Sequence, residues 1–434
     1  MSRLVRILAL AGTLALAGCP EQNVQPGTDA GTTPGTDAAA VATDASTPAA
    51  PDTGVVSSHA YKGHENDSDM NAFVNAYPAT VGTRLDDCQT CHKSATLTDT
   101  SNVDKKVSKT ACDFCHLIQH PMTGTYDPAQ PTNFAETLNP YGAAYVAAGR
   151  TQAALTKIDD MDSDGDTFAN GVEIADIKYP GDSASKPGQP VAPLKVFTKA
   201  QLQALPAHSE FLLANSTKQQ YDYYATYKGV KLTDLLTAVG VDPTDANIIG
   251  VTVIAPDGFT SDITKEEMNR LYPKAQFWAG LDTATLGTTC GFVQYPETIP
   301  AGLVDGGEIP DDQYLMLAYE RDGKPMDACT YDATSGKING EGPYRLVFPQ
   351  AKPGKPDRGS QYSPQPTCTN AAGDPDGFDF VSSADHNAGA MTRGVVVVRI
   401  NPLPAGYEDI DAKNRGWAFV ENATVMVYGY GVTQ

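Results

Sequence analysis

The sequence is short of basic residues and of long apolar runs. Its 434 residues contain 31 Lys and Arg against 52 Asp and Glu, which gives a formal net charge of −21 at pH 7. A body this acidic repels phosphate backbones and anionic membrane surfaces, which argues against nucleic acid as a partner. The apolar run from Ile7 to Ala17 is well below the roughly 20 residues that a membrane-spanning helix needs.

Motifs for hydrolysis and nucleotide chemistry are also missing. No Ser-His-Asp arrangement, phosphate-binding loop or HExxH zinc motif is recognisable, so neither activity is predicted. Apolar residues make up 41% and charged residues 19%, with 39 Gly and 31 Pro. This composition is typical of a loop-rich protein rather than a helical bundle, and the length fits two or three domains.

The N-terminus reads as an export signal. Arg3 and Arg6 precede the apolar run, which ends in Leu16-Ala17-Gly18-Cys19, the pattern of a signal peptide over residues 1–18. The small residues before Cys19 resemble a bacterial lipobox, which implies that Cys19 is lipidated; an ordinary signal peptide is the alternative. By the same resemblance, Pro20 after the Cys implies the outer membrane.

Residues 19–56 are predicted to be a disordered tether. The part from residue 20 onward has five acidic residues, no basic residue and no aromatic residue, so it cannot build a core. A coil of this length reaches on the order of 33 Å. The tether would therefore hold a folded body away from the membrane.

Two short motifs predict covalent haem. They are Cys88-Gln89-Thr90-Cys91-His92 and Cys112-Asp113-Phe114-Cys115-His116. Two thiols at this spacing can bond to the vinyl groups of one porphyrin, and the adjacent histidine then lies beneath the iron as an axial ligand. A thioredoxin-like redox pair and a four-Cys zinc site are the alternatives, but neither explains why a histidine follows the second Cys both times. Two haem c groups are expected in a domain over residues 57–158.

The remaining histidines nearby suggest the distal ligands. Five of the seven histidines lie between residues 59 and 120. His120 is one helical turn after His116 on the same face, so it could reach only the neighbouring porphyrin. We expect bis-histidine ligation with His64 and His120, with His59 in reserve and Met122 as a weaker candidate. A helix over residues 138–155 is predicted to pack Tyr141, Tyr145 and Leu155 on this domain.

An acidic loop in residues 159–193, the predicted junction and linker, has calcium-binding spacing. Oxygen-bearing side chains stand at positions 1, 3, 5, 9 and 12 of an EF-hand-like loop, and these are Asp162, Asp164, Asp166, Asn170 and Glu173. The carbonyl of Phe168 would supply position 7. Position 6 is Thr167 where glycine is usual, and a solvated acidic turn is the alternative reading. We expect one structural Ca²⁺, followed by a short helix over 172–178.

The segment 194–434 is predicted to be a β-rich α+β domain, so the whole chain is a multidomain α+β protein with a small, mostly α or irregular dihaem domain first. Strands are expected over 249–254, 314–319, 344–348, 395–400 and 424–428. Helices are expected over 232–239, with Gly240 as C-cap, and over 264–271.

This domain resembles the molybdopterin-binding domain of the sulfite oxidase family over about residues 195–350, and less surely to 434. The resemblance is carried by Tyr227-Lys228-Gly229-Val230, Leu235-Leu236, Gly240-Val241, Asp257-Gly258-Phe259, Leu317-Ala318-Tyr319-Glu320, Gly323-Lys324-Pro325 and Gly342-Pro343-Tyr344-Arg345-Leu346-Val347. That family binds molybdenum through a Cys thiolate beside a basic pterin pocket. Cys290, Cys329 and Cys368 instead lie in Gly/Thr/Pro-rich insertions without such a cluster, which argues against bound molybdopterin.

These three cysteines are expected to form one disulfide in an oxidising compartment. We take Cys290 with Cys329 as the pair and leave Cys368 over. His208 and His386 could serve a site in this domain, although a surface histidine is the commoner outcome.

Taken together, the residues predict a lipid-anchored, exported dihaem c-type cytochrome that carries electrons between redox protein partners in the periplasm or at the cell surface. The alternatives are a molybdopterin oxidoreductase whose haems drain its electrons, and a surface-binding protein in which the haems sense redox state.

Overall fold

The fold was analysed in a computed structural model of the chain. It describes residues 68–87, 90–91, 95–98, 106–109, 138–332, 337–362, 368 and 379–433. Helices and sheets are mixed within these ranges, so the α+β class is confirmed at this coarse level. No helix in the described ranges is long and apolar enough to cross a membrane.

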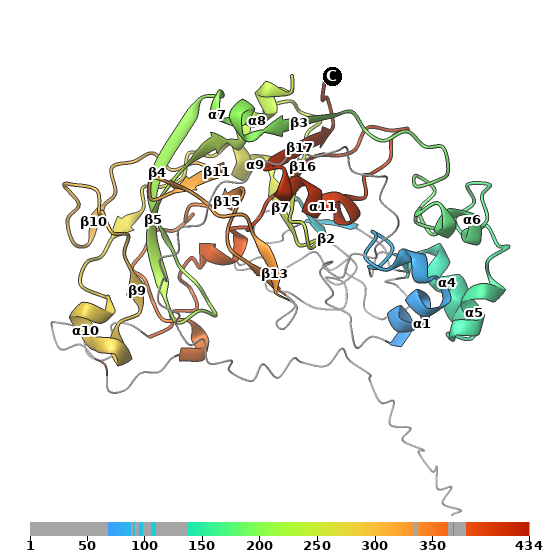
Figure 1. The fold of residues 1–434 in the computed structure, drawn as a ribbon, viewed down its shortest axis with the longest axis horizontal. Coiled ribbons are helices and arrows are strands. Elements are labelled where there is room, and N and C mark those ends of the chain that lie inside the picture. Colours follow the sequence, from blue (N-terminus) through green and yellow to red (C-terminus); the bar gives the residue numbers. More distant parts are fainter. Residues whose placement is uncertain are drawn as a thin grey trace, which may run out of the picture.

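The first part is a group of short helices, which we call the helical module (residues 68–91 and 138–185). Its helices are α1 (Ser68–Ala76), α4 (Pro140–Ala147), α5 (Gln152–Lys157) and α6 (Asn170–Ala175), with a 3₁₀ turn η1 (Pro78–Thr80). They gather at one side of the molecule, apart from the large sheets (Figure 1). Their apolar faces share one core that includes Phe73, Leu85, Tyr141 and Leu155.

The single helix predicted over 138–155 is wrong, because the chain breaks it into α4 and α5. Gly149 has φ +114° and Arg150 has φ +52°, and this left-handed backbone cannot continue a helix. The Arg150 guanidinium pairs with the Asp69 carboxylate at 2.6 Å, and Thr151 caps the start of α5 by accepting the Ala154 N–H. The expected burial of Tyr141, Tyr145 and Leu155 is confirmed.

The second part, which we call the sheet domain (residues 194–433), contains a five-stranded sheet in the order β3-β17-β16-β6-β7. Its strands are β3 (Leu194–Thr198), β6 (Gly250–Ile254), β7 (Thr260–Thr264), β16 (Val397–Asn401) and β17 (Thr424–Gly429). Only the pair β16–β17 is parallel in this sheet. The crossover between them contains α11 (Ala412–Glu421).

A six-stranded sheet lies beside it, built on the long antiparallel pair β4 (Ala207–Ala214) and β5 (Asp222–Lys231). It continues through β11 (Met316–Arg321) to β12 (Lys324–Pro325), while β15 (Arg345–Val347) pairs with β11 and β9 (Val293–Gln294) pairs with β5.

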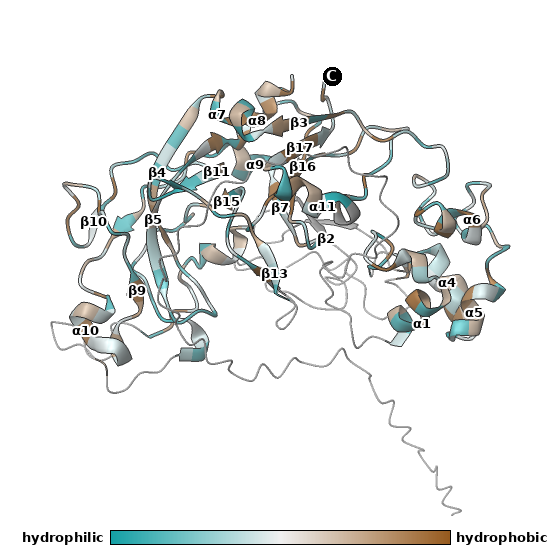
Figure 2. Ribbon diagram, viewed as in Figure 1, coloured by the Kyte–Doolittle hydropathy of each residue, from teal (hydrophilic) through white to brown (hydrophobic). Residues whose placement is uncertain are grey.

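The main core lies between these two sheets. It takes Phe211 and Tyr224 from the six-stranded sheet and Val398 and Val427 from the five-stranded sheet. Since strand side chains alternate between faces, the neighbouring Val397, Met426 and Tyr428 point the other way. They pack with Ala412 and Val420 of α11. β16 and β17 accordingly contribute apolar residues to clusters on both faces of the sheet, and Figure 2 shows the hydropathy of each residue along the strands.

Shorter elements complete the described structure. They are the helices α7 (Lys199–Gln203), α8 (Leu232–Ala238), α9 (Lys265–Asn269) and α10 (Thr283–Cys290), the 3₁₀ turns η3 (Ser360–Tyr362) and η4 (Asn387–Ala390), and the two-stranded pairs β1 (Ala95–Thr98) with β2 (Lys106–Lys109), β8 (Gln276–Phe277) with β10 (Gly307–Glu308), and β13 (Thr330–Asp332) with β14 (Lys337–Asn339). The strand β2, which lies between the two Cys-x-x-Cys-His motifs in sequence, runs beside β7, the edge strand of the five-stranded sheet.

The predicted disulfide is wrong. Cys290 pairs with Cys368, with their Cα atoms 5.4 Å apart, and not with Cys329. The reason is position, because Cys329 is buried in the cluster under α11 with Ile254 and Val396. Cys290 instead ends α10, where its carbonyl accepts a hydrogen bond from Arg358 at 2.9 Å.

Candidate metal centre and haem-attachment segment

The acidic loop is closed at its base by backbone hydrogen bonds between α5 and α6. The Asn170 N–H donates to the Met161 carbonyl at 2.7 Å, and the Gly171 N–H donates to the Asp159 carbonyl at 3.0 Å. The Asn170 side chain adds two more bonds, donating to the Ile158 carbonyl and accepting from the Ser163 N–H. Asn170 therefore holds the loop ends together in addition to standing at the predicted ligand position.

Asp162 organises the turn. Its carboxylate accepts the N–H groups of Gly165, Asp166 and Thr167 at 2.8, 3.2 and 2.9 Å. These bonds, led by the one from Thr167, lower the pKa of Asp162, so it remains charged. Thr167 itself has φ +84°, the left-handed conformation that glycine usually supplies at this position of a calcium loop.

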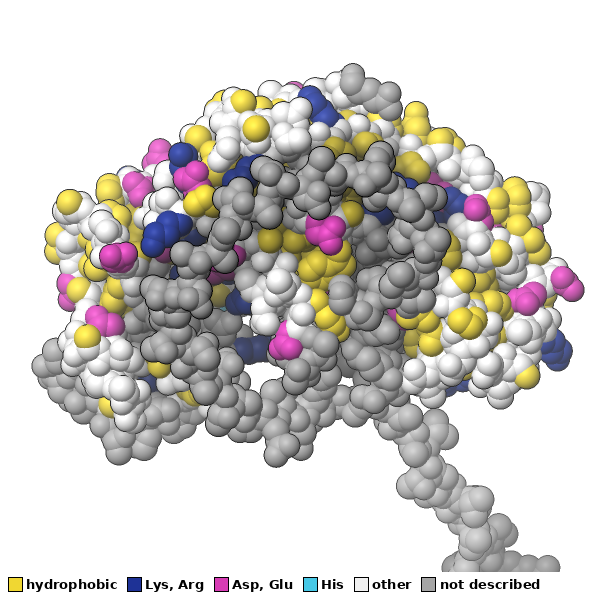
Figure 3. Space-filling model, viewed as in Figure 1, with side chains coloured by type: hydrophobic (Ala, Val, Ile, Leu, Met, Phe, Trp, Pro, Cys, Tyr) yellow, Lys and Arg dark blue, Asp and Glu magenta, His cyan; other side chains and the backbone are white. Residues whose placement is uncertain are grey.

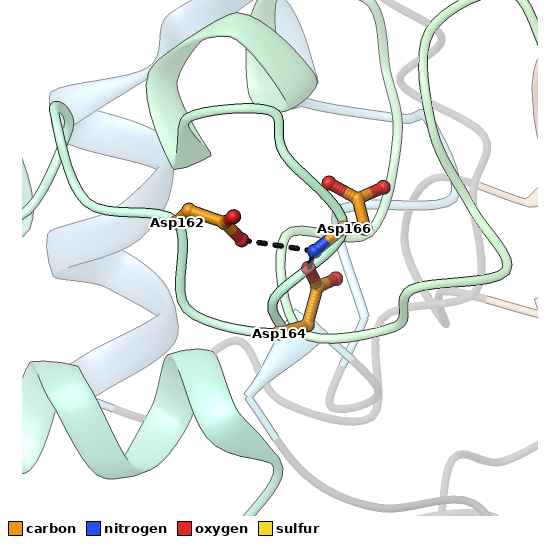
Figure 4. A group of neighbouring side chains, drawn as sticks. All are labelled: Asp162, Asp164 and Asp166. Atoms are coloured by element: carbon orange, nitrogen blue, oxygen red, sulfur yellow. Dashed lines mark hydrogen bonds between the residues drawn. The ribbon is translucent and has the colours of Figure 1, made fainter.

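Three carboxylates converge inside the turn. Asp162, Asp164 and Asp166 each offer an oxygen, and these oxygens lie within 4.8 Å of one another. Figure 4 shows the three side chains around the loop, with the Asp166 N–H bonded to both other carboxylates. The Phe168 N–H donates to Asp166 Oδ1 at 2.9 Å, which keeps the backbone of Phe168 at the same turn. One oxygen each of Asp164 and Asp166 is buried without a hydrogen-bond partner among the described residues.

Among the acidic residues of the loop, Glu173 gives the strongest indication of a metal site. Its side chain is 0% exposed, and neither carboxylate oxygen has a hydrogen-bond partner in the described part of the chain. Burial, followed by the negative charges of Asp164, Asp166 and Asp162, raises the pKa of Glu173 to about 9. Burial and Asp166 likewise raise the pKa of Asp164 to about 6. Unpaired buried carboxylates are costly, and a bound divalent cation removes that cost.

Asp182 is a further acidic residue near this group that the twelve-residue spacing missed. Its charge contributes to the raised pKa of both Asp164 and Glu173. One of its oxygens accepts the Ala184 N–H at 3.1 Å. The signal available in the sequence was the turn Pro180-Gly181-Asp182, which follows α6. The candidate metal centre is thus defined by the three converging aspartates Asp162, Asp164 and Asp166, with the buried Glu173 coupled to them by charge.

Of the first haem motif the structure describes Thr90 and Cys91. Cys91 is half-buried and packs against the aromatic core of the helical module. Its carbonyl accepts the Asn139 N–H at 2.9 Å, and the Asn139 side chain donates to the Thr90 carbonyl at 3.1 Å. Asn139 is also the N-cap of α4. The start of α4 therefore holds the backbone of the motif.

The fit between α4 and the motif depends on Gly142. A Cβ atom at this position would lie 2.0 Å from the Cys91 carbonyl oxygen. Only a residue without a side chain allows the helix to approach the motif this closely. Beyond the contact, Phe73 and Tyr141 meet edge to face with ring centroids 6.3 Å apart, so the motif borders an apolar, aromatic surface.

The other predicted haem residues lie outside the described residues. They are Cys88, His92, Cys112, Cys115 and His116 of the two motifs and the distal candidates His64, His120, His59 and Met122. The predicted lipidation site, Cys19, also lies outside them.

The cysteines of the sheet domain do not form a thiolate site. Cys290 and Cys368 are joined, and the Cys329 thiol is 3% exposed. Burial, followed by the charge of Asp257, raises the pKa of Cys329 to about 12. Burial therefore disfavours the thiolate form of Cys329.

The two histidines of the sheet domain are each paired with a carboxylate. His386 is buried, with Nε2 3.0 Å from Asp357 Oδ1, and its ring stacks on Phe380. His208 is half-buried, with Nε2 3.1 Å from Glu210 Oε2. Both are tied into the fold rather than placed together at one site. The sequence matches no protein-family model and no curated protein.

Proposed function

We propose that this protein is an exported, lipid-anchored dihaem c-type cytochrome that carries electrons between redox protein partners. The observation that carries the proposal is the pair of Cys-x-x-Cys-His motifs at 88–92 and 112–116. A haem held in this way supplies one-electron redox chemistry.

The residues around Cys91 fit such a group. A porphyrin needs an apolar surface beside its attachment point, and Cys91 packs against a core that contains Phe73, Tyr141 and Tyr145. Hydrogen bonds from Asn139 fix the backbone of the motif. In this proposal Cys88 with Cys91 and Cys112 with Cys115 tether the two haems, His92 and His116 are the proximal ligands, and His64 and His120 are the distal ones. The finer architecture, a small α or irregular dihaem domain before a sulfite oxidase-like domain, belongs to the same proposal.

The acidic loop is proposed to hold one Ca²⁺. The carrying observation is Glu173, a fully buried carboxylate with no hydrogen-bond partner among the described residues, whose pKa is raised by burial and by the charges of the three converging aspartates. Hard oxygen donors at this density favour Ca²⁺ over softer metals. Asp162, Asp164, Asp166, Glu173 and the Phe168 carbonyl would bind it, with Asn170 closing the loop. The charge of Asp182 adds to the negative potential at the same site.

The sheet domain is proposed to dock a redox partner rather than to bind molybdopterin. Its described cysteines offer no accessible thiolate, since two form a disulfide and the third is buried and neutral. The alternative of a molybdopterin oxidoreductase therefore lacks a metal ligand among these residues.

The experiment is expression in a bacterium that matures c-type cytochromes, followed by the mass and visible spectrum of the purified protein. We expect the mass of two haems above the peptide, reducible α-bands, and on metal analysis about two irons, about one calcium and no molybdenum per chain. A colourless product with only the mass of the peptide would refute the proposal of a cytochrome. Molybdenum near one per chain would instead support the alternative of a molybdopterin oxidoreductase.

The distal ligands and the anchor are tested separately. Replacing His64 or His120 by alanine should convert a low-spin haem spectrum partly to high spin, with His208→Ala in the sheet domain as the control. Unchanged bands would remove that histidine from the scheme. Cys19→Ser should abolish labelling by a radioactive fatty acid and release the protein from the membrane, whereas retained labelling would contradict the anchor.

A further inference from the structure

The C-terminal end of α6 connects the candidate metal centre to the haem-attachment segment. The Glu173 carboxylate is coupled by charge to the three aspartates of the centre, while its backbone carbonyl accepts the Lys178 N–H at 2.8 Å. Between them, Ile177 adopts φ +55°, and its carbonyl accepts a hydrogen bond from Arg84 Nε at 2.9 Å. Arg84 is four residues before Cys88, so α6 and the first motif share this contact.

Tyr179 strengthens the same link. The Arg84 guanidinium lies over the Tyr179 ring, 5.1 Å from its centroid, which is within the range of a cation–π contact. The Tyr179 hydroxyl donates to the Arg84 carbonyl at 3.2 Å. Both the side chain and the backbone of Arg84 are therefore held by Ile177 and Tyr179, which follow α6 and its C-cap.

The Arg84 side chain also contacts the sheet domain. It forms an ion pair with Glu408, and its Nη1 donates to the Asp409 carbonyl at 2.9 Å. Glu408 is 2% exposed and is also paired with Lys178. A carboxylate buried between two cations is stable only while both stay in place, because removing either leaves a buried charge with incomplete pairing. We call Arg84, Lys178 and Glu408 the latch.

A second connection reaches the motif from Asp182. The neighbouring Gly181 packs so closely on Asn139 that a Cβ would lie 2.5 Å from Asn139 Oδ1. Asn139 in turn holds the carbonyls of Thr90 and Cys91. The segment around the candidate metal centre thus contacts the motif on both sides, through Arg84 before it and through Asn139 at its end.

We propose that Ca²⁺ in the 162–173 loop closes the latch, and so holds the first haem-attachment motif in place and docks it onto the sheet domain. The inference rests on the proposed calcium site and haem attachment. Without the cation, both carboxylate oxygens of Glu173 and one oxygen each of Asp164 and Asp166 are buried without a hydrogen-bond partner among the described residues, which is costly. Turning Glu173 toward water removes that cost and moves the end of α6, which precedes Ile177, Lys178 and Tyr179.

The test is hydrogen–deuterium exchange of the full-length haem protein with saturating calcium or with a calcium chelator. Calcium should slow exchange in three regions, namely the loop itself, residues 84–91 and residues 405–412, by about tenfold, as for a typical coupling between two sites.

Glu408→Gln should keep calcium binding and the protection of the loop but lose the protection of 405–412. Arg84→Lys, which keeps the charge and loses the forked donor, should do the same. Glu266→Gln, which removes an exposed ion pair with Arg270, is the control and should behave as the wild type.

Each outcome bears on a different claim. If calcium binds the wild type but protects only the loop, the latch is wrong while the calcium site stands. If protection of 405–412 persists in both latch variants, Glu408 and Arg84 do not carry the coupling. If calorimetry detects no calcium binding, the proposed site fails and the latch fails with it. The haem spectrum and mass are recorded on the same samples, so loss of haem is recognised independently.

Discussion

Glu173 illustrates at the scale of one residue how a metal site can be inferred from the energetic cost of leaving it empty. The carboxylate is fully buried and unpaired among the described residues, and burial and the charges of three aspartates raise its pKa. Replacing it by glutamine removes a group whose ionisation is unfavourable without metal and is needed to bind metal. The same substitution should therefore have opposite effects on stability in the two states.

We expect Glu173→Gln to raise the free energy of unfolding by about 1–3 kcal/mol in chelator, and to weaken calcium binding by at least about tenfold. Thermal unfolding with and without calcium, together with calorimetric titration, measures both quantities. Asp160→Asn changes an exposed carboxylate next to the loop and should do neither. If Glu173→Gln lowered the free energy of unfolding in chelator, the unpaired Glu173 carboxyl group would not be costly to bury.

The pair Glu210–His208 should make the stability of the fold depend on pH. Burial raises the pKa of Glu210 to about 7 from 4.5, although hydrogen bonds from His208 and the Tyr314 N–H oppose the shift. The hydrogen bond to Glu210 raises the pKa of His208, and Asp311 and Lys231 are the other charges that face the pair. Both groups bind a proton more tightly in the folded state than in the unfolded state, so their contribution to stability is complete below pH 4.5 and is lost as the pH rises through about 7.

Denaturant unfolding between pH 4.5 and 8 should show this decline, with about 1–3 kcal/mol from Glu210. Glu210→Gln should flatten that part of the profile, and Glu266→Gln should leave it unchanged. A profile that rises through neutral pH in the wild type and is unaffected by Glu210→Gln would show that the carboxylate is already ionised in the fold.

At the scale of elements, local signals predicted local structure. The helix expected at 232–239 is found as α8 with Gly240 at φ +83°, and the helix expected at 264–271 begins with a capping box from Thr264 to Glu267. The strands β6, β16 and β17 start within two residues of the expected positions. These elements are fixed by caps and by apolar runs that the sequence displays directly.

Features that depend on contacts between residues far apart in the sequence could not be predicted. The pair β4–β5 escaped notice because β5 is buried on both faces, which removes the alternation that identifies a strand. The break between α4 and α5 is stabilised by Asp69, which is far away in sequence. Likewise, the spacing of the acidic loop predicted a metal centre, whereas the part played by Asp182 and the pairing of Cys290 with Cys368 depend on tertiary contacts.

The contact of α4 with the haem motif leads to a prediction at this scale. In an exposed helix, Gly→Ala is usually stabilising by up to about 1 kcal/mol. At Gly142 the new Cβ would clash with the Cys91 carbonyl oxygen, so Gly142→Ala should instead destabilise the helical module by about 1–3 kcal/mol and lower the yield of attached haem. Gly354→Ala is the matched control, because nothing lies within 4 Å of its Cβ position. Chemical unfolding and the ratio of haem absorbance to protein report the result; a neutral effect at Gly142 would show that α4 can shift away.

At the scale of the whole molecule, charge should govern how the protein meets its redox partners. The net charge is −21, and on the face drawn in Figure 3 the basic side chains are scattered rather than gathered into one patch. A field of one sign accelerates encounter with cations and slows encounter with anions, and salt screens both effects. The proposed haems lie on an acidic body, so small reagents of opposite charge can measure that field directly.

We therefore expect reduction of the haems by a cationic ruthenium hexaammine complex to slow as ionic strength rises. Reduction by an anionic reagent such as dithionite should become faster over the same range, and a neutral mediator should show little dependence. Stopped-flow absorbance in the α-band measures the rates. A chain lacking the acidic tether, residues 20–56, loses five negative charges and no positive one, so both salt dependences should weaken if the tether lies near the haems and persist if the folded body sets the field. A cationic reagent whose rate rises with salt would show that the haem edges lie in a locally positive surface, contrary to the net charge.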